Sequence, residues 1–154
     1  MMAKTEKTST DPLDDKILRL LLDNSRQSYR EIARKLSISV ATVMKRVQLL
    51  EKSKMIKGYT ALLDYEKLGY DVGVLIEVRI SKGKLLEMER RIASHPNVAA
   101  VYDHTGNFDC LILAKFKTRK QMDKFLKHIQ TWDFVQRTET MLILNTLKEA
   151  PIKI

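Results

Sequence analysis

Residues 11–57 carry apolar side chains at the spacing of amphipathic helices. Residues 11–21 form the first such segment, with Asp11 placed as N-cap, Pro12 at the first helical position and acids in the first turn. Its apolar positions share one side of a helix: Leu13, Ile17, Leu20 and Leu21. We therefore expect a helix here that packs against the next two helices through its apolar side.

A short helix, a tight turn and a longer helix are predicted next, over residues 28–36, 37–38 and 39–52. One side of the longer helix is apolar and forms its predicted core stripe: Val40, Val43, Val47 and Leu50. Two helices joined by a short turn make up a helix-turn-helix unit, whose second helix reads DNA. The three helices predict a compact domain over residues 11–57, preceded by a polar, disordered tail over residues 1–10.

The pattern changes after residue 57. A linker strand and hinge are expected over residues 58–70, with Gly69 closing a short turn. Strands and helices then alternate: strands over residues 72–80, 98–104, 110–116 and about 135–147, and helices over residues 85–94 and 119–130. Two consecutive strand-helix-strand units define the ferredoxin-like βαββαβ arrangement. The sequence thus predicts an α+β fold, with a helix-turn-helix domain, a ferredoxin-like domain over residues 71–148 and a tail over residues 149–154.

The predicted strands are apolar on both faces. This is clearest in three runs: Val74-Leu75-Ile76, Leu111-Ile112-Leu113 and Met141-Leu142-Ile143-Leu144. A half-exposed antiparallel sheet would alternate apolar and polar residues. Because the two helices of this arrangement cover only one face, we expect a second copy of the domain to cover the other, which gives a homodimer. A dimer would also present two recognition helices to successive major grooves, about 34 Å apart.

Positive charge is concentrated in the helix-turn-helix segment. Residues 26–57 hold nine Lys and Arg but only two acids, Glu31 and Glu51, and so supply +7 of the chain's +9. Cationic side chains suit phosphates and guanine edges, small ones allow close approach, Gln pairs with adenine, and a capped helix N-terminus binds phosphate. The candidate DNA contacts are Ser28, Tyr29, Arg30, Ser39, Ala41, Thr42, Lys45, Arg46 and Gln48. The alternative is a solvated basic face with Tyr29 as an ordinary surface tyrosine.

Composition excludes several other classes. No apolar run approaches the roughly 18 residues that cross a bilayer, and the polar N-terminus lacks a signal peptide's apolar core, so we expect a cytoplasmic protein. The lone Cys110 lies in an apolar run and is expected to be a buried core thiol. His95, His104 and His128 lack metal-ligand spacing. With no triad, phosphate loop or paired carboxylates, we expect neither an enzyme nor a cofactor.

Several short motifs together resemble the leucine-responsive regulatory protein and AsnC family. They are Leu13-Asp14, Ile17-Leu18, Arg46-Val47, Ile56-Lys57-Gly58-Tyr59 and Thr105-Gly106-Asn107-Phe108-Asp109. Their order and spacing over residues 11–148 carry the resemblance. It implies a prokaryotic feast/famine transcription regulator with an N-terminal DNA-binding domain. It also implies a C-terminal domain that senses amino acids and assembles dimers into tetramers or larger rings, often octamers.

The resemblance also implies an effector site. In the family the amino acid lies between dimers, close to a loop that here is Gly106, Asn107, Phe108 and Asp109. The Asp109 carboxylate can accept from a ligand ammonium group, and loop amides can donate to its carboxylate. Further candidates are Thr138 and Thr140 on the final strand and Tyr102 and His104 beside the loop. Asn107 stands where some relatives have an acid, which favours a neutral side chain, glutamine first, over lysine or arginine.

Other interpretations of the same residues stay open. Gly-Asn is a common turn pair, so the loop could be a simple hairpin, and Thr is an ordinary strand residue. The basic unit could belong to an architectural protein that packs DNA with little sequence preference and strong salt dependence. Whether the protein represses, activates or does both is not encoded in these motifs.

Overall fold

The computed structural model describes residues 10–154 except residues 82 and 84. The chain divides into two compact units: one runs up to Leu62 and includes Glu149–Ile154, and the other spans Leu63–Lys148. The division falls inside the segment predicted as the linker. The tail predicted over residues 1–10 lies outside the described residues, apart from residue 10.

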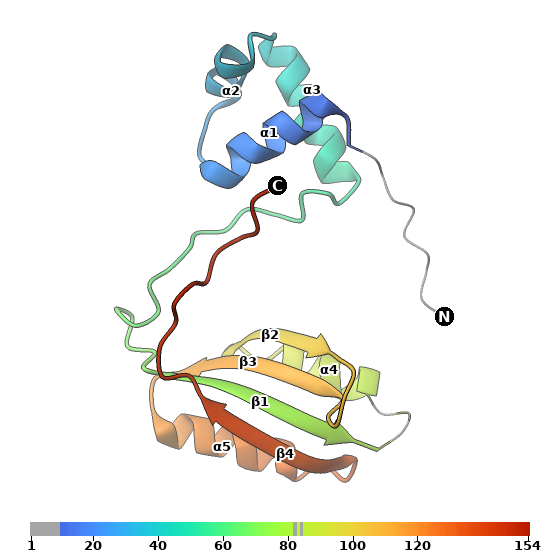
Figure 1. Ribbon diagram of the computed structural model, residues 1–154, viewed down its shortest axis with the longest axis vertical. Coiled ribbons are helices and arrows are strands. Elements are labelled where there is room, and N and C mark those ends of the chain that lie inside the picture. Colours follow the sequence, from blue (N-terminus) through green and yellow to red (C-terminus); the bar gives the residue numbers. More distant parts are fainter. Residues whose placement is uncertain (1–9, 82, 84) are drawn as a thin grey trace. The chain divides into compact units, whose positions relative to one another are not determined.

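The first unit contains the three predicted helices, α1 (Pro12–Asp23), α2 (Tyr29–Leu36) and α3 (Val40–Lys52) (Figure 1). Asp11 caps α1 as predicted, accepting hydrogen bonds from the backbone N–H groups of Leu13 and Asp14 at 2.9 Å. Ser28 and Ser39 cap α2 and α3 in the same way. Local capping signals therefore fix where each helix begins.

The core of this unit lies between the three helices. Its buried members are Ile17, Ile32, Ala33, Val43, Val47 and Leu50. The prediction that Val40 belongs to the core stripe is wrong, because its side chain is 44% exposed. Val40 is the first residue of α3, and the buried stripe begins one turn later at Val43. Periodicity gives a residue's direction around a helix, but it does not show how far along the helix the packing partners extend.

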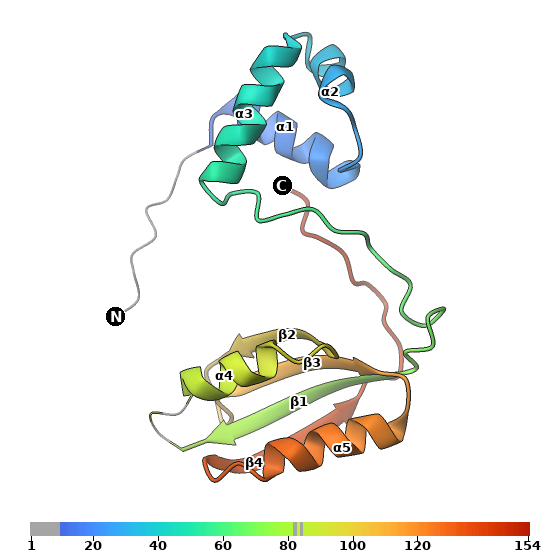
Figure 2. The ribbon, with the colours of Figure 1, turned by 180° about the vertical axis from the view of Figure 1, so that it is seen from behind.

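The second unit is the predicted ferredoxin-like domain. Its elements are β1 (Val72–Ile80), α4 (Leu85–Ala93), β2 (Val98–Asp103), β3 (Cys110–Phe116), α5 (Arg119–Gln130) and β4 (Val135–Leu142). The four strands form an antiparallel sheet in the order β2-β3-β1-β4. Figures 1 and 2 show the sheet from opposite sides, with both helices packed on the same face.

Two predictions about strands are corrected. The linker strand expected within residues 58–70 is absent, since these described residues form no strand. The final strand ends at Leu142 rather than near Leu147. Val74 pairs with Leu142, and the N–H of Ile143 still donates to the Gly73 carbonyl at 2.9 Å. Because β1 begins at Val72, only two residues before Val74, its pairing with the last strand could extend no further than Leu144.

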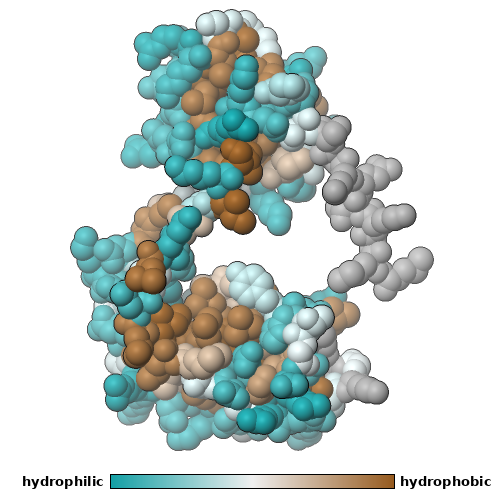
Figure 3. Space-filling view, in the orientation of Figure 1, coloured by the Kyte–Doolittle hydropathy of each residue, from teal (hydrophilic) through white to brown (hydrophobic). Residues whose placement is uncertain are grey.

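The two faces of the sheet have different surroundings. Alternate residues of β1 and β3 are buried beneath the helices, and Cys110 is among them, as predicted: Val74, Ile76, Val78, Ile80, Cys110, Ile112, Ala114 and Phe116. The intervening residues of β1 and β3 face away from the helices, together with the residues of β2 and β4 that pair with them. Several of these residues are apolar or aromatic: Leu75, Leu111, Leu113, Met141 and Tyr102. We call this second surface the open face. Figure 3 shows hydrophobic surface gathered over these strands, seen from the side away from the helices.

Among the residues described, no helix is both long and apolar enough to span a bilayer.

Candidate functional site

The outer side of α3 presents the side chains that were predicted to meet DNA. Ala41, Lys45 and Gln48 are all exposed along this helix. Thr42 is half-buried, and its hydroxyl lies 2.8 Å from that of Ser39, whose Oγ also accepts from the Thr42 N–H at 3.0 Å. Small, cationic and amide side chains thus form one surface, which has the composition expected of a recognition helix.

The turn between α2 and α3 orients this helix. Ser37 adopts a left-handed conformation with φ 55°, and the Ile38 N–H donates to the Ala33 carbonyl at 3.0 Å. The chain therefore reverses within two residues and reaches the Ser39 cap, which is the geometry of a helix-turn-helix.

Arg46 has a role inside the domain that periodicity did not predict. Its guanidinium donates to the Asp11 carboxylate and lies 3.3 Å from Asp14 Oδ1. The pKa of the Asp11 carboxyl is lowered, mainly by the hydrogen bond from the Asp14 N–H and also by Arg46. The ion pair therefore ties α3 to the start of α1, while a DNA contact by Arg46 stays a prediction.

The three candidates at the start of α2 differ in their surroundings. Ser28 and Glu31 form a capping box, in which the Ser28 N–H donates to Glu31 Oε2 at 2.7 Å and Ser28 Oγ accepts from the Glu31 N–H at 3.2 Å. Tyr29 is half-buried and packs against the helical core, whereas Arg30 is exposed. Arg30 is therefore the one of the three whose side chain is fully available.

The loop between β2 and β3 holds the predicted effector residues, and its ends are anchored. Gly106 has φ 135°, a conformation that favours glycine, although a Cβ there would meet nothing within 4 Å. Asp109 Oδ2 accepts from the Ile80 N–H at 2.7 Å, and the Asp109 N–H donates to the Val78 carbonyl at 3.0 Å. Asp109 thus fastens the loop to the end of β1, a role that the sequence did not indicate.

Three of the effector candidates, Tyr102, His104 and Phe108, lie on the side of the open face. Tyr102 pairs with Leu111 on this face, and His104 Nε2 lies 4.0 Å from Glu77 Oε1. His104 Nε2 is buried and has no hydrogen-bond partner. The Arg137 guanidinium lies 5.5 Å from the centroid of the Phe108 ring, which is a cation–π geometry. The loop thus presents an aromatic ring, and a carboxylate, an imidazole and a guanidinium lie beside it.

Thr138 and Thr140 lie on the other side of the sheet. They pair directly with Val78 and Ile76, both of which are buried beneath the helices, and paired residues share a face. Thr138 also accepts a hydrogen bond from Gln130 Nε2 of α5 at 2.9 Å. Within one chain the sheet therefore separates the two threonines from His104 and Phe108.

Comparisons with known proteins decide the family. A family model described as the Lrp/AsnC ligand binding domain matches residues 73–152. A second, described as winged helix-turn-helix DNA-binding, matches residues 10–57. The chain belongs to the Lrp/AsnC family. It is thus a DNA-binding transcription regulator that carries the Lrp/AsnC ligand-binding domain, and the family is not one of enzymes.

Related proteins agree with this family assignment. An uncharacterised HTH-type transcriptional regulator of Pyrococcus furiosus is 44% identical over 139 residues, which cover 90% of this chain and 94% of the relative. The structure of Escherichia coli AsnC matches with a TM-score of 0.85 at 29% identity, over 95% of this chain and 99% of that one. A Neisseria meningitidis regulator solved as an L-Met complex matches with a TM-score of 0.82 at 25% identity, over 92% and 94% of the two chains.

Among the described residues, no group of three or more His, Cys, Asp or Glu could hold a metal ion.

Glu77 and Arg137 were not predicted as neighbours of the loop, because they come from strands that are far from it in the sequence. The alternation of strand residues would have placed both on the open face once the register was known.

Proposed function

We propose that this regulator acts as a homodimer that binds DNA through the outer side of α3 and senses an amino acid with a neutral side chain. Glutamine is the first candidate, and no further cofactor is required. The observation that carries the proposal is the apolar open face beside a loop rich in polar and aromatic groups. One surface would join two subunits, and the loop beside it would bind the effector.

The apolar residues of the open face support the dimer. Leu75, Leu111 and Leu113 lie side by side on β1 and β3, and Met141 of β4 extends this surface. Burying such a surface against its equivalent in a second copy would be favourable, at about 25 cal/mol per Å² of apolar area. Leu113→Glu should therefore shift the protein toward monomer in sedimentation velocity, whereas the exposed helical control Lys124→Glu should not. An unchanged oligomer in Leu113→Glu would contradict the dimer through this face.

The groups around the loop support an amino-acid effector. A carboxylate such as Glu77 or Asp109 can accept from an ammonium group, and Arg137 or loop N–H groups can donate to a carboxylate. Asn107 is exposed and uncharged, which suits a neutral amide better than a cationic side chain. The Neisseria regulator, solved as an L-Met complex, supports a neutral ligand by analogy.

Effector binding would act on DNA through the assembly. An amino acid that favours one arrangement of subunits over another shifts the equilibrium between them, and so changes the spacing of paired α3 helices. The size of the effect is limited by the ligand's difference in affinity for the two arrangements.

A thermal-shift screen against the twenty amino acids tests the effector directly. A ligand that binds only the folded protein raises its melting temperature, by an amount that grows with concentration. Asp109→Asn is the appropriate variant, because its amide oxygen can still accept from the Ile80 N–H at the site now filled by Oδ2. Asp123→Asn on the exposed side of α5 is the matched control.

The outcomes separate sensing from DNA binding. Stabilisation by glutamine that is lost in Asp109→Asn but kept in Asp123→Asn would support the site. Stabilisation that survives in Asp109→Asn would place the effector elsewhere. If no amino acid stabilised the protein while DNA binding showed strong salt dependence and little sequence preference, an architectural role would replace the sensor.

A further inference from the structure

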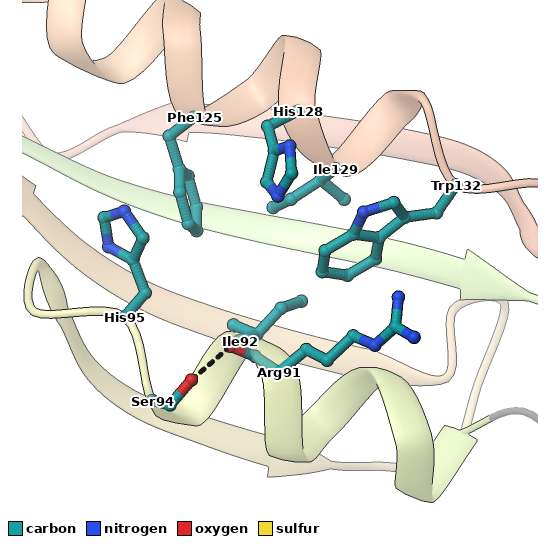
Figure 4. Close-up of a pocket in the computed structure, with 8 residues that line it drawn as sticks. All are labelled: Arg91, Ile92, Ser94, His95, Phe125, His128, Ile129 and Trp132. Atoms are coloured by element: carbon teal, nitrogen blue, oxygen red, sulfur yellow. Dashed lines mark hydrogen bonds between the residues drawn. The ribbon is translucent and has the colours of Figure 1, made fainter.

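A cavity between α4 and α5 is separate from both surfaces already described. Its volume is about 260 Å³, and it lies on the helix-covered side of the sheet, away from the open face. Eight residues line it: Arg91, Ile92, Ser94, His95, Phe125, His128, Ile129 and Trp132. Figure 4 shows these side chains converging from the two helices and from the turns that follow them.

Four of the eight residues that line this cavity carry rings: His95, Phe125, His128 and Trp132. The rings of His95 and Phe125 are 4.6 Å apart between centroids and tilted by 56°, and those of His128 and Trp132 are 5.4 Å apart in an edge-to-face arrangement. Such rings favour a flat, apolar guest that meets their faces and edges. An engineered apolar cavity of about 150 Å³ takes up benzene, so this one has room for a single ring with a small polar substituent.

The polar groups of the cavity are donors suited to an anion. Arg91 extends along it, with its guanidinium 5.8 Å from the centroid of the Trp132 ring. A guanidinium has five N–H donors, so it can bind a ligand while keeping other partners. Among the described residues, none that lines the cavity is acidic.

His95, which also lines the cavity, has a defined tautomer. Its Nδ1 accepts from the Asn97 N–H at 3.2 Å, so the proton of the neutral ring lies on Nε2. Burial, followed by the neighbouring His128, lowers the pKa of His95 and so favours this neutral form. The Ser94 hydroxyl already donates to the Arg91 carbonyl at 2.8 Å and closes the end of α4.

We propose that the cavity between α4 and α5 is a second ligand site, and that it binds a carboxylate with a single aromatic ring. The ring would lie between the Phe125 and Trp132 side chains, and the carboxylate would face Arg91. This site is independent of the amino-acid site at the loop, because the sheet lies between the cavity and the open face.

Trp132 makes the proposal directly testable. It is the only tryptophan of the chain, so its fluorescence reports on this cavity alone. Titration of the full-length protein with benzoate should change the fluorescence in a saturable way, and the uncharged isostere benzamide should bind at least tenfold more weakly. The same preference should appear in thermal shifts.

Variants distinguish a carboxylate site from non-specific quenching. Arg91→Gln should weaken benzoate binding about tenfold, which corresponds to about 1.4 kcal/mol, and should leave benzamide unaffected. Arg90→Gln, an exposed neighbour on the same helix that does not line the cavity, is the matched control. Ser94→Leu is a second variant for the case that Arg91→Gln disturbs folding. Ser94 is an exposed lining residue, so the larger side chain should narrow the cavity and weaken the binding of both compounds.

Three results would overturn the proposal. They are the absence of saturable change with benzoate, equal affinities for benzoate and benzamide, and equal benzoate affinities in the Arg91→Gln and Arg90→Gln proteins.

Discussion

Replacing Lys45 by alanine should reduce both the DNA affinity of the protein and its salt dependence. Lys45 is exposed on the outer side of α3, with Ala41 one turn before it and Gln48 nearly one turn after it. Each phosphate contact contributes about 0.9 to the slope of log K against log salt, so two copies of Lys45 that contact phosphates in the proposed dimer would contribute about 1.8. Over a fourfold rise in salt concentration, the parent should then lose about twelvefold more affinity than Lys45→Ala.

Arg46→Ala provides the contrast, although it changes the neighbouring residue on the same helix. Arg46 pairs with Asp11 and Asp14, and so links α3 to α1. Its loss should lower the melting temperature, whereas Lys45→Ala should leave it unchanged because Lys45 is exposed and outside the core. The two variants thus separate a surface that binds DNA from an ion pair that holds the domain together.

The assay is fluorescence anisotropy with two labelled duplexes at several salt concentrations. One duplex would be recovered by selection from a random library, and the other would be a random sequence. Thermal unfolding of each variant would be followed in the same buffers. If Lys45→Ala kept the parent's affinity and salt slope on both duplexes, the assignment of α3 as the recognition helix would be refuted.

Three further predictions concern the folded domains. Ile112→Ala removes a fully buried side chain from the core of the sheet and should cost about 2–5 kcal/mol in urea unfolding, with secondary structure retained in the absence of denaturant. Burial and the hydrogen bond to Glu51 raise the pKa of Tyr59 to about 12, so stability should fall between pH 10 and 12, and Glu51→Gln should lower this pKa in phenolate absorbance titrations. The pKa of Asp11 is lowered from 3.8, so its contribution to stability is present above that value and lost below it; Asp11→Asn should flatten this acid limb in unfolding at a series of pH values.

The sequence predicted the features that depend on neighbouring residues. Asp11 and Pro12 marked the start of α1, and Ser39 marked the start of α3, because capping is decided within three or four residues. The bounds of β1 and β3 agree with those expected from their apolar runs, and the bounds of α5 agree with its helical periodicity. Capping residues, apolar runs and helical periodicity were therefore sufficient for the fold class.

The features that were missed depend on partners distant in the sequence. Arg46 and Asp11 are 35 residues apart, and no periodic pattern links them. The last strand ends close to the first residues of β1, and only the register of the two strands shows this limit. The cavity between α4 and α5 combines side chains of two helices whose relative position comes from packing on the sheet. The prediction that Val40 is buried failed for a similar reason, because burial at this position depends on where the partner helices end.

The effector candidates lie on opposite faces of the sheet. His104 and Phe108 lie toward the open face, whereas Thr138 and Thr140 pair with residues beneath the helices. Because strand residues alternate between faces, no rotamer change can bring the two groups together through the sheet. An amino acid that contacts both groups must therefore lie between subunits, with the loop supplied by one chain and the threonines by another. Its apparent affinity would then fall as the protein is diluted and the subunits separate.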